Sequence, residues 1–129
     1  MAKQEKFFIC KTCGNLVGTL YFSGVPMICC GNPMEKIISN TVDASNEKHV
    51  PVFNINKNII EVKIGNEPHP MIKEHFIEWI YIETKQGGQR KSLAPENKPE
   101  ANFSLIDDEL IAVYAYCNLH GLWKASVWI

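Results

Sequence analysis

The strongest signal of fold class lies near the end of the chain, in Leu110-Ile-Ala-Val-Tyr-Ala-Tyr116, Cys117-Asn-Leu-His120-Gly121 and residues 122–128 (Leu-Trp-Lys-Ala-Ser-Val-Trp). Branched and aromatic residues fill the stretches on either side of the Cys-x-x-His, as they do in β-strands. Five similar stretches precede this pair, separated by turn signals such as Gly65-Asn66 and Gly87-Gly88. The predicted strands are residues 50–55, 59–64, 76–84, 89–93, 101–105, 110–116 and 122–128.

Seven short strands in this part of the chain favour an antiparallel sandwich of immunoglobulin-like type. No stretch has a sustained helical period with capping residues, so we expect helices to be scarce. The predicted fold class is therefore all-β.

Residues 1–37 have a different composition: short apolar pieces are broken by Gly14, Gly18, Gly24, Pro26 and Gly31. A segment so small and rich in turns cannot bury enough apolar surface to fold alone, and a bound metal would supply the missing stabilisation. Residues 38–46 are mostly polar and indicate a linker. We therefore expect a metal-stapled module (1–37), a linker (38–46) and the sandwich (47–129).

Charge and hydropathy exclude several classes of protein. The net charge of −1 over 129 residues argues against a nucleic-acid binder, which would show a basic stripe. No apolar stretch approaches the roughly 20 residues needed to cross a bilayer, and the start of the chain lacks the apolar core of a signal peptide. Five cysteines, an odd number, without an export signal favour a reducing compartment. We expect a cytoplasmic protein whose thiolates are available to metals.

All five cysteines and four histidines fall into two groups with the spacing of metal ligands. The first group is Cys10, Cys13, Cys29 and Cys30, and the second is His49, His69, His75, Cys117 and His120. Residues used only for packing would leave some outside any group, so this pattern indicates a protein built around two metals.

Cys10-Lys-Thr-Cys13-Gly14 is typical of a metal knuckle, in which two thiolates reach one ion from a tight turn that the glycine permits. Cys29 and Cys30 are adjacent, so both reach the same ion only if the chain bends sharply, as Gly31 allows. A disulfide between them would be strained and would be reduced in the expected compartment. Iron and zinc both accept four sulfur ligands in a tetrahedron, so the spacing leaves that choice open.

The second group suits iron better than zinc. Structural zinc sites use four protein ligands and catalytic sites use three plus water, so five would be unusual. Iron accepts four nitrogens and one axial sulfur and keeps an open sixth position. An axial thiolate donates electron density through the iron to whatever binds at that open position. Such a centre is expected to bind and reduce a small oxygen species.

Two alternatives belong to other classes. A blue-copper electron carrier uses two His, one Cys and a weak axial Met, but residues 121–129 contain no Met and two histidines would remain unused. A zinc-stapled binding module without catalysis is favoured only if both sites hold zinc.

Several long motifs make the chain resemble the desulfoferrodoxin family of two-iron superoxide reductases over nearly its whole length. Cys10-Lys-Thr-Cys13-Gly14-Asn15 with Cys29-Cys30-Gly31 resembles the family's desulforedoxin-like N-terminal module. Glu47-Lys48-His49-Val50-Pro51, His69-Pro70-Met71, His75 with Trp79, and residues 116–124 (Tyr-Cys-Asn-Leu-His-Gly-Leu-Trp-Lys) resemble its catalytic domain.

The resemblance implies one iron held by the four N-terminal cysteines and a second held by four equatorial histidines and axial Cys117. It implies a short β module followed by a seven-stranded immunoglobulin-like sandwich, usually as a homodimer. The implied reaction is the one-electron reduction of superoxide to hydrogen peroxide, with re-reduction by a rubredoxin-like donor.

Lys48 and Glu47, next to His49, are the candidate catalytic residues outside the ligand set. A positive charge at Lys48 would attract the superoxide anion to the open site and hold water near the bound product. Glu47 resembles the family's carboxylate that binds the iron once the product leaves. Five aromatic residues of the sandwich are expected to serve packing or an interface: Trp79, Tyr114, Tyr116, Trp123 and Trp128.

Overall fold

The computed structural model describes residues 7–40 and 46–127, except for the side chains of Asn46 and Glu47. The chain divides after Ile38 into two compact units, which are described separately below. Residues 41–45 of the predicted linker and Trp128 lie outside the described residues.

The N-terminal unit consists of short strands joined by tight turns. Strand β1 (Phe7–Ile9) pairs with β2 (Leu16–Gly18) and with β5 (Glu35–Lys36), while β3 (Ile28–Cys29) and β4 (Asn32–Pro33) form a separate hairpin. Only Phe7, Phe8 and Cys10 are buried apolar residues among the described part of this unit. Such a small core provides little stability by itself.

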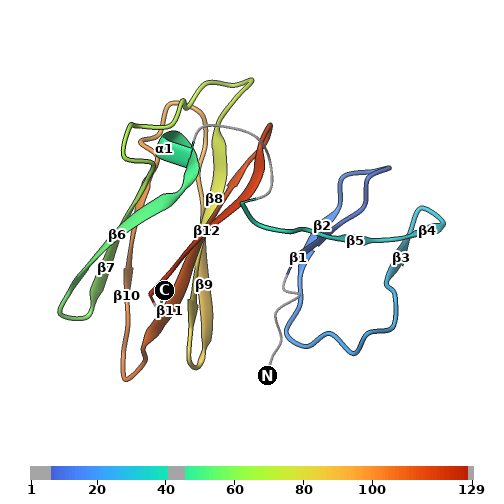
Figure 1. Cartoon of the computed structure of the whole chain (residues 1–129), viewed down its shortest axis with the longest axis horizontal. Coiled ribbons are helices and arrows are strands. Elements are labelled where there is room, and N and C mark those ends of the chain that lie inside the picture. The colour runs from blue at the N-terminus through green and yellow to red at the C-terminus, as the bar shows by residue number, and fades with distance from the viewer. Residues whose placement is uncertain (1–6, 41–45, 128–129) are drawn as a thin grey trace. The chain divides into compact units, whose positions relative to one another are not determined.

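The second unit is a sandwich of two antiparallel sheets, coloured green to red in Figure 1. The three-stranded sheet has the order β10-β7-β6 and the four-stranded sheet has the order β12-β11-β8-β9. The strands are β6 (Pro51–Asn56), β7 (Ile59–Ile64), β8 (Ile77–Thr84), β9 (Gly87–Ser92), β10 (Glu100–Ser104), β11 (Leu110–Cys117) and β12 (Gly121–Ser126).

The core lies between these two sheets, because alternate residues of each strand face inward. Ile60, Val62 and Phe103 come from the first sheet, while Ile80 and Val113 come from the second, and all five are at most 2% exposed. Cys117 is a member of the same cluster and is fully buried. The last inward residue of β11 is therefore a thiol at the edge of the core.

The structure confirms the all-β prediction. Within residues 46–127 it contains seven strands, each overlapping one of the predicted stretches, and a single helix of four residues, α1 (Asn46–His49). The described residues include no helix that is long and apolar enough to cross a membrane.

One irregularity in the ladder bears on the site. Tyr116 of β11 pairs with Trp79 of β8, but the next residue, Cys117, pairs with Ile77, so Glu78 is an extra residue on β8. A bulge of this kind bends the strand and changes the direction of neighbouring side chains. Both Ile77 and Cys117 point into the core as a result.

Candidate metal centres

The four N-terminal cysteines come together at one end of the first unit. Their four Sγ atoms all lie within 4.8 Å of one another. Cys10 directly follows β1, and two backbone bonds, from Cys10 N–H to the Asn15 carbonyl (2.8 Å) and from Gly14 N–H to the Cys10 carbonyl (2.8 Å), close the knuckle turn. Gly14 has a φ of 87°, a conformation that glycine adopts without strain.

The adjacent pair Cys29 and Cys30 reaches the same point because the chain reverses there. Cys30 and Gly31 have φ values of 52° and 79° and form the two-residue loop between β3 and β4, in which Cys29 pairs with Asn32. Two consecutive positive φ values are typical of the tight hairpin turn that fits strand twist. The bend that adjacent ligands require is therefore present.

Hydrogen bonds within the cluster shift the pKa values of its thiols in opposite directions. The pKa of Cys10 falls to about 6, mainly because the Cys13 backbone N–H donates to its sulfur. The pKa of Cys30 rises to about 12, mainly because of its hydrogen bond with the Cys13 side chain. Four thiolates at this separation repel one another, and a cation at their centre would remove that repulsion.

The second cluster lies at the end of the sandwich where β6 and β12 begin and β11 ends. It contains His49 at the end of α1, His69 and His75 in the loop between β7 and β8, and Cys117 at the end of β11. One ligand atom from each of these four residues lies within 4.8 Å of the other three. His120, in the turn between β11 and β12, places its Nδ1 atom 3.1 Å from His49 Nε2 and 3.9 Å from Cys117 Sγ.

The four imidazole rings are arranged as the sides of a square. Around the ring His49, His69, His75, His120, successive centroids are 4.6, 4.7, 5.1 and 4.9 Å apart, and neighbouring planes are 78–84° from each other. The diagonal from His49 to His75 is longer, 6.3 Å, and these two rings are 30° from parallel. Four nitrogens in this arrangement surround one central position.

The buried nitrogen atoms indicate that this position suits a metal. The Nε2 atoms of His69 and His75 are buried and have no hydrogen-bond partner. His69 Nδ1 lies 2.7 Å from the Pro70 carbonyl, which can only accept, so Nδ1 carries the proton and Nε2 has a free lone pair. A buried acceptor without a partner is costly, and a metal ion at the centre would satisfy it.

The site favours neutral imidazoles. Burial is the main cause that lowers the pKa of His69 to about 4, although the Pro70 carbonyl opposes the shift. Burial also lowers the pKa of His75, and the charges of His120 and Lys48 add to that effect. Neutral histidine is the form that binds metals, so the ligands are ready near neutral pH.

Cys117 receives support from its own turn. Burial raises the pKa of its thiol, whereas the backbone N–H groups of His120 and Leu119 lower it. The His120 nitrogen lies 3.4 Å from the sulfur. These donors would stabilise a thiolate once a metal displaced the proton.

Two residues that support the cluster were not assigned to it from the sequence. Trp123, predicted to serve packing, is 1% exposed, stacks on His49 with centroids 4.8 Å apart, and donates from Nε1 to the His120 carbonyl (3.1 Å). Asn118 bonds to the loop that carries His75. Its place between Cys117 and His120 was the only sequence signal, since the bonds join residues more than 40 positions apart.

The two candidate catalytic residues lie in α1. Lys48 is exposed, and its charge acts on His75, where it helps to lower the pKa. The Glu47 side chain lies outside the described residues. The structure therefore places a positive charge within electrostatic reach of the second cluster.

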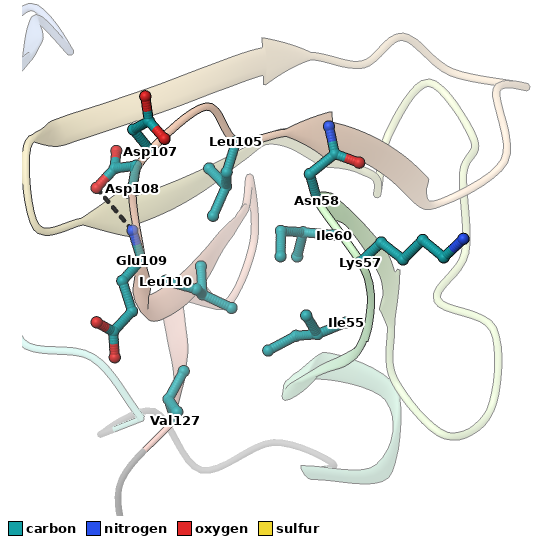
Figure 2. Close-up of a pocket in the computed structure, with 10 residues that line it drawn as sticks. All are labelled: Ile55, Lys57, Asn58, Ile60, Leu105, Asp107, Asp108, Glu109, Leu110 and Val127. Carbon is teal, nitrogen blue, oxygen red and sulfur yellow. Dashed lines mark hydrogen bonds between the residues drawn. The ribbon is translucent and has the colours of Figure 1, made fainter.

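A pocket of about 300 Å³ opens at the other end of the sandwich and contains none of the predicted ligands. Ile55, Ile60 and Leu105 contribute to its apolar lining, and Figure 2 shows the Asp108 carboxylate bonded to the Glu109 backbone nitrogen at its rim. Among the described residues of this unit, the histidine and cysteine cluster lies at the opposite end of the sandwich.

Comparisons with known proteins agree on one family. Residues 41–126 match the sequence profile of desulfoferrodoxin, and residues 2–37 match that of the desulfoferrodoxin N-terminal domain. The chain is 45% identical over 126 residues to a desulfoferrodoxin of Syntrophotalea carbinolica, covering 98% of this chain and 99% of that protein.

Solved structures give the same result. A superoxide reductase from Treponema pallidum is similar with a TM-score of 0.81 and 34% identity, covering 96% of this chain and all of the other. A superoxide reductase (1Fe-SOR) from Giardia intestinalis covers 64% of this chain and 99% of its own, with a TM-score of 0.56 and 29% identity.

Proposed function

The chain belongs to the desulfoferrodoxin family, and we propose that it is a superoxide reductase whose reaction takes place at the second cluster. Superoxide gains one electron and two protons and leaves as hydrogen peroxide, and an external donor restores the electron. The observation that carries this proposal is the square of four imidazoles next to one buried thiol.

The ligands of the reaction centre are His49, His69, His75, His120 and Cys117. Iron held by these residues would supply the electron, and the Cys117 thiolate would raise the electron density on it. Burial lowers the pKa of His69 and of His75 and so favours their neutral forms, and the Pro70 carbonyl fixes the His69 tautomer. Contacts of this kind orient ligands toward a metal without touching it.

Lys48 is proposed to attract the substrate. Superoxide is an anion and the chain has a net charge of −1, so a local positive charge is needed to raise its concentration near the centre. The influence of Lys48 on the pKa of His75 supports this role. Glu47 is proposed, from the family resemblance, as the carboxylate that takes the product's place after release.

The first cluster is proposed to hold a second iron through Cys10, Cys13, Cys29 and Cys30. Its role is to stabilise a module whose own apolar core is very small. We propose the division into an iron module (1–37), a linker (38–46) and a reductase sandwich (47–129).

The partners are proposed from the family resemblance. The reaction consumes one electron per superoxide, and the resemblance implies a rubredoxin-like protein as the electron donor. A homodimer is supported by the large apolar side chains that the N-terminal unit exposes, since such surface is typical of interfaces; these are Leu20, Tyr21, Val25, Ile28 and Ile38. A cytoplasmic location is supported by five cysteines that form no disulfide.

Metal analysis combined with stopped-flow mixing tests the function. The reduced protein should contain two irons per chain and convert superoxide to peroxide without releasing oxygen. Copper with an intense blue band would support an electron carrier, and two zinc ions without turnover would support a binding module. Either result would overturn the proposal.

A further inference from the structure

We infer that Asn118 is a positioning residue of the second metal centre, which joins the loop carrying His75 to the turn carrying Cys117 and His120. Its side-chain nitrogen donates to the Glu74 carbonyl (3.0 Å), and its side-chain oxygen accepts from the Phe76 N–H (2.9 Å). Its own backbone N–H donates to the Phe76 carbonyl (3.2 Å). The two partners flank His75, so the amide grips the chain on both sides of that residue.

The loop's internal bonds cannot do the same. Ile72 and His75 exchange two backbone hydrogen bonds of 3.1 and 3.0 Å, which fix the shape of the turn but not its position relative to β11. Ile72, Lys73 and Glu74 are exposed, so packing adds little there. The Asn118 bonds therefore act together with the pairing of Ile77 and Cys117 to set where the His75 ring lies relative to the Cys117 sulfur.

The side chain must provide a donor and an acceptor at once. An amide group bonds the Glu74 carbonyl and the Phe76 N–H together, as one peptide group pairs with another. Asp at this position would keep the acceptor but turn a charged oxygen toward the Glu74 carbonyl. Ala would lose both side-chain bonds and keep only the backbone bond from residue 118 to the Phe76 carbonyl.

This inference rests on the proposed metal centre and not on superoxide turnover. Residues that orient metal ligands through hydrogen bonds usually change metal affinity by about 10- to 100-fold when they are replaced. We expect Asn118→Ala to weaken ferrous-ion binding at the second centre by about that factor, and Asn118→Asp to weaken it less. In both variants the thiolate-to-iron absorption of the oxidised centre should shift, because His75 and Cys117 change their relative positions.

Asp108 provides the matched control, since its carboxylate also joins distant backbone segments by accepting from Gln86 N–H (3.1 Å) and Glu109 N–H (2.8 Å). It lies at the far end of the sandwich, beside the pocket in Figure 2. Asp108→Ala should lower the melting temperature but leave iron affinity and the absorption spectrum unchanged.

The experiment titrates metal-free protein with ferrous ion against a competing chelator. Each sample is then oxidised, and the thiolate-to-iron absorption of the oxidised second centre records its occupancy. Weaker binding and a shifted band in Asn118→Ala, with neither change in Asp108→Ala, support the inference. Unchanged affinity and spectrum in Asn118→Ala, or equal losses in both variants, overturn it. Should Asn118→Ala fail to fold, Asn118→Asp decides by the same two readouts. The result does not depend on whether the protein reduces superoxide.

Discussion

At the scale of single residues, the second cluster is prepared by contacts that each act on one ring. The Pro70 carbonyl selects the tautomer of His69, and the indole of Trp123 packs against the face of His49. Burial keeps His69 and His75 neutral. The metal-binding lone pairs are thus fixed by groups that do not touch the metal position.

Lys48 gives a test of the electrostatic part of the mechanism. Replacing Lys48 by Gln should slow the encounter with superoxide by about two- to tenfold at low salt, because one charge near the site contributes on the order of 1 kcal/mol. Salt screens such charges over about 10 Å at 0.1 M. Stopped-flow rates should therefore fall with salt in the wild type and respond less in the variant.

Lys57→Gln is the control, because it removes the same charge at the far end of the sandwich, beside the pocket in Figure 2. Its rate and salt dependence should match those of the wild type. If both variants behave alike, only net charge matters, and Lys48 has no steering role.

At the scale of elements, the β8–β9 hairpin depends on a glycine. Tyr81 belongs to the neighbouring strand β8, and a Cβ added at Gly88 of β9 would overlap its ring. We expect Gly88→Ala to destabilise the protein by about 1–3 kcal/mol, since the ring must leave its rotamer or the strands must separate. Urea denaturation measures this loss. Gly88→Ala should cost much less stability when it is added to Tyr81→Ala than when it is added to the wild type.

The turns at the far end of the sandwich predict a pH effect. The pKa of Asp108 is lowered, first by the Thr84 hydroxyl and then by the backbone N–H groups of Glu109, Gln86 and Lys85. A folded pKa below the unfolded value stabilises the protein above that unfolded value, and the contribution is lost as pH falls through the folded pKa.

Asp108→Asn should therefore be less stable than the wild type at pH 7, and the difference should shrink by pH 3. Urea midpoints of both proteins at the two pH values provide the measurement. A constant difference would mean that the carboxylate's charge is not what stabilises the turns.

The elements that could be predicted from the sequence are those whose signals are local. Strand β7 begins and ends where predicted, at Ile59 and Ile64, because alternating branched residues and turn residues mark it. The helix α1 was missed, since four residues carry no helical period. The support from Trp123 and Asn118 could not be predicted either, because it depends on how strands and loops far apart in sequence come together.

At the scale of the whole molecule, the chain joins two units with different sources of stability. The sandwich has a continuous core between its sheets. The N-terminal unit buries only three apolar residues among those described, so we attribute most of its stability to the metal that its four cysteines would bind. Metal binding of this kind contributes about 10–16 kcal/mol in small zinc peptides.

Cys13→Ser tests whether the units are independent. The variant should contain one iron per chain instead of two, because three thiolates hold the first iron too weakly. Its N-terminal unit should then unfold, and limited proteolysis should cut within residues 1–38. Superoxide reduction should stay within about twofold of the wild-type rate, since all five proposed ligands of the second centre lie in the sandwich.

His75→Ala is the converse control: it should lose the second iron and turnover while the first centre remains. If Cys13→Ser keeps its second iron yet fails to react with superoxide, the first centre takes part in the reaction and the two units are not independent.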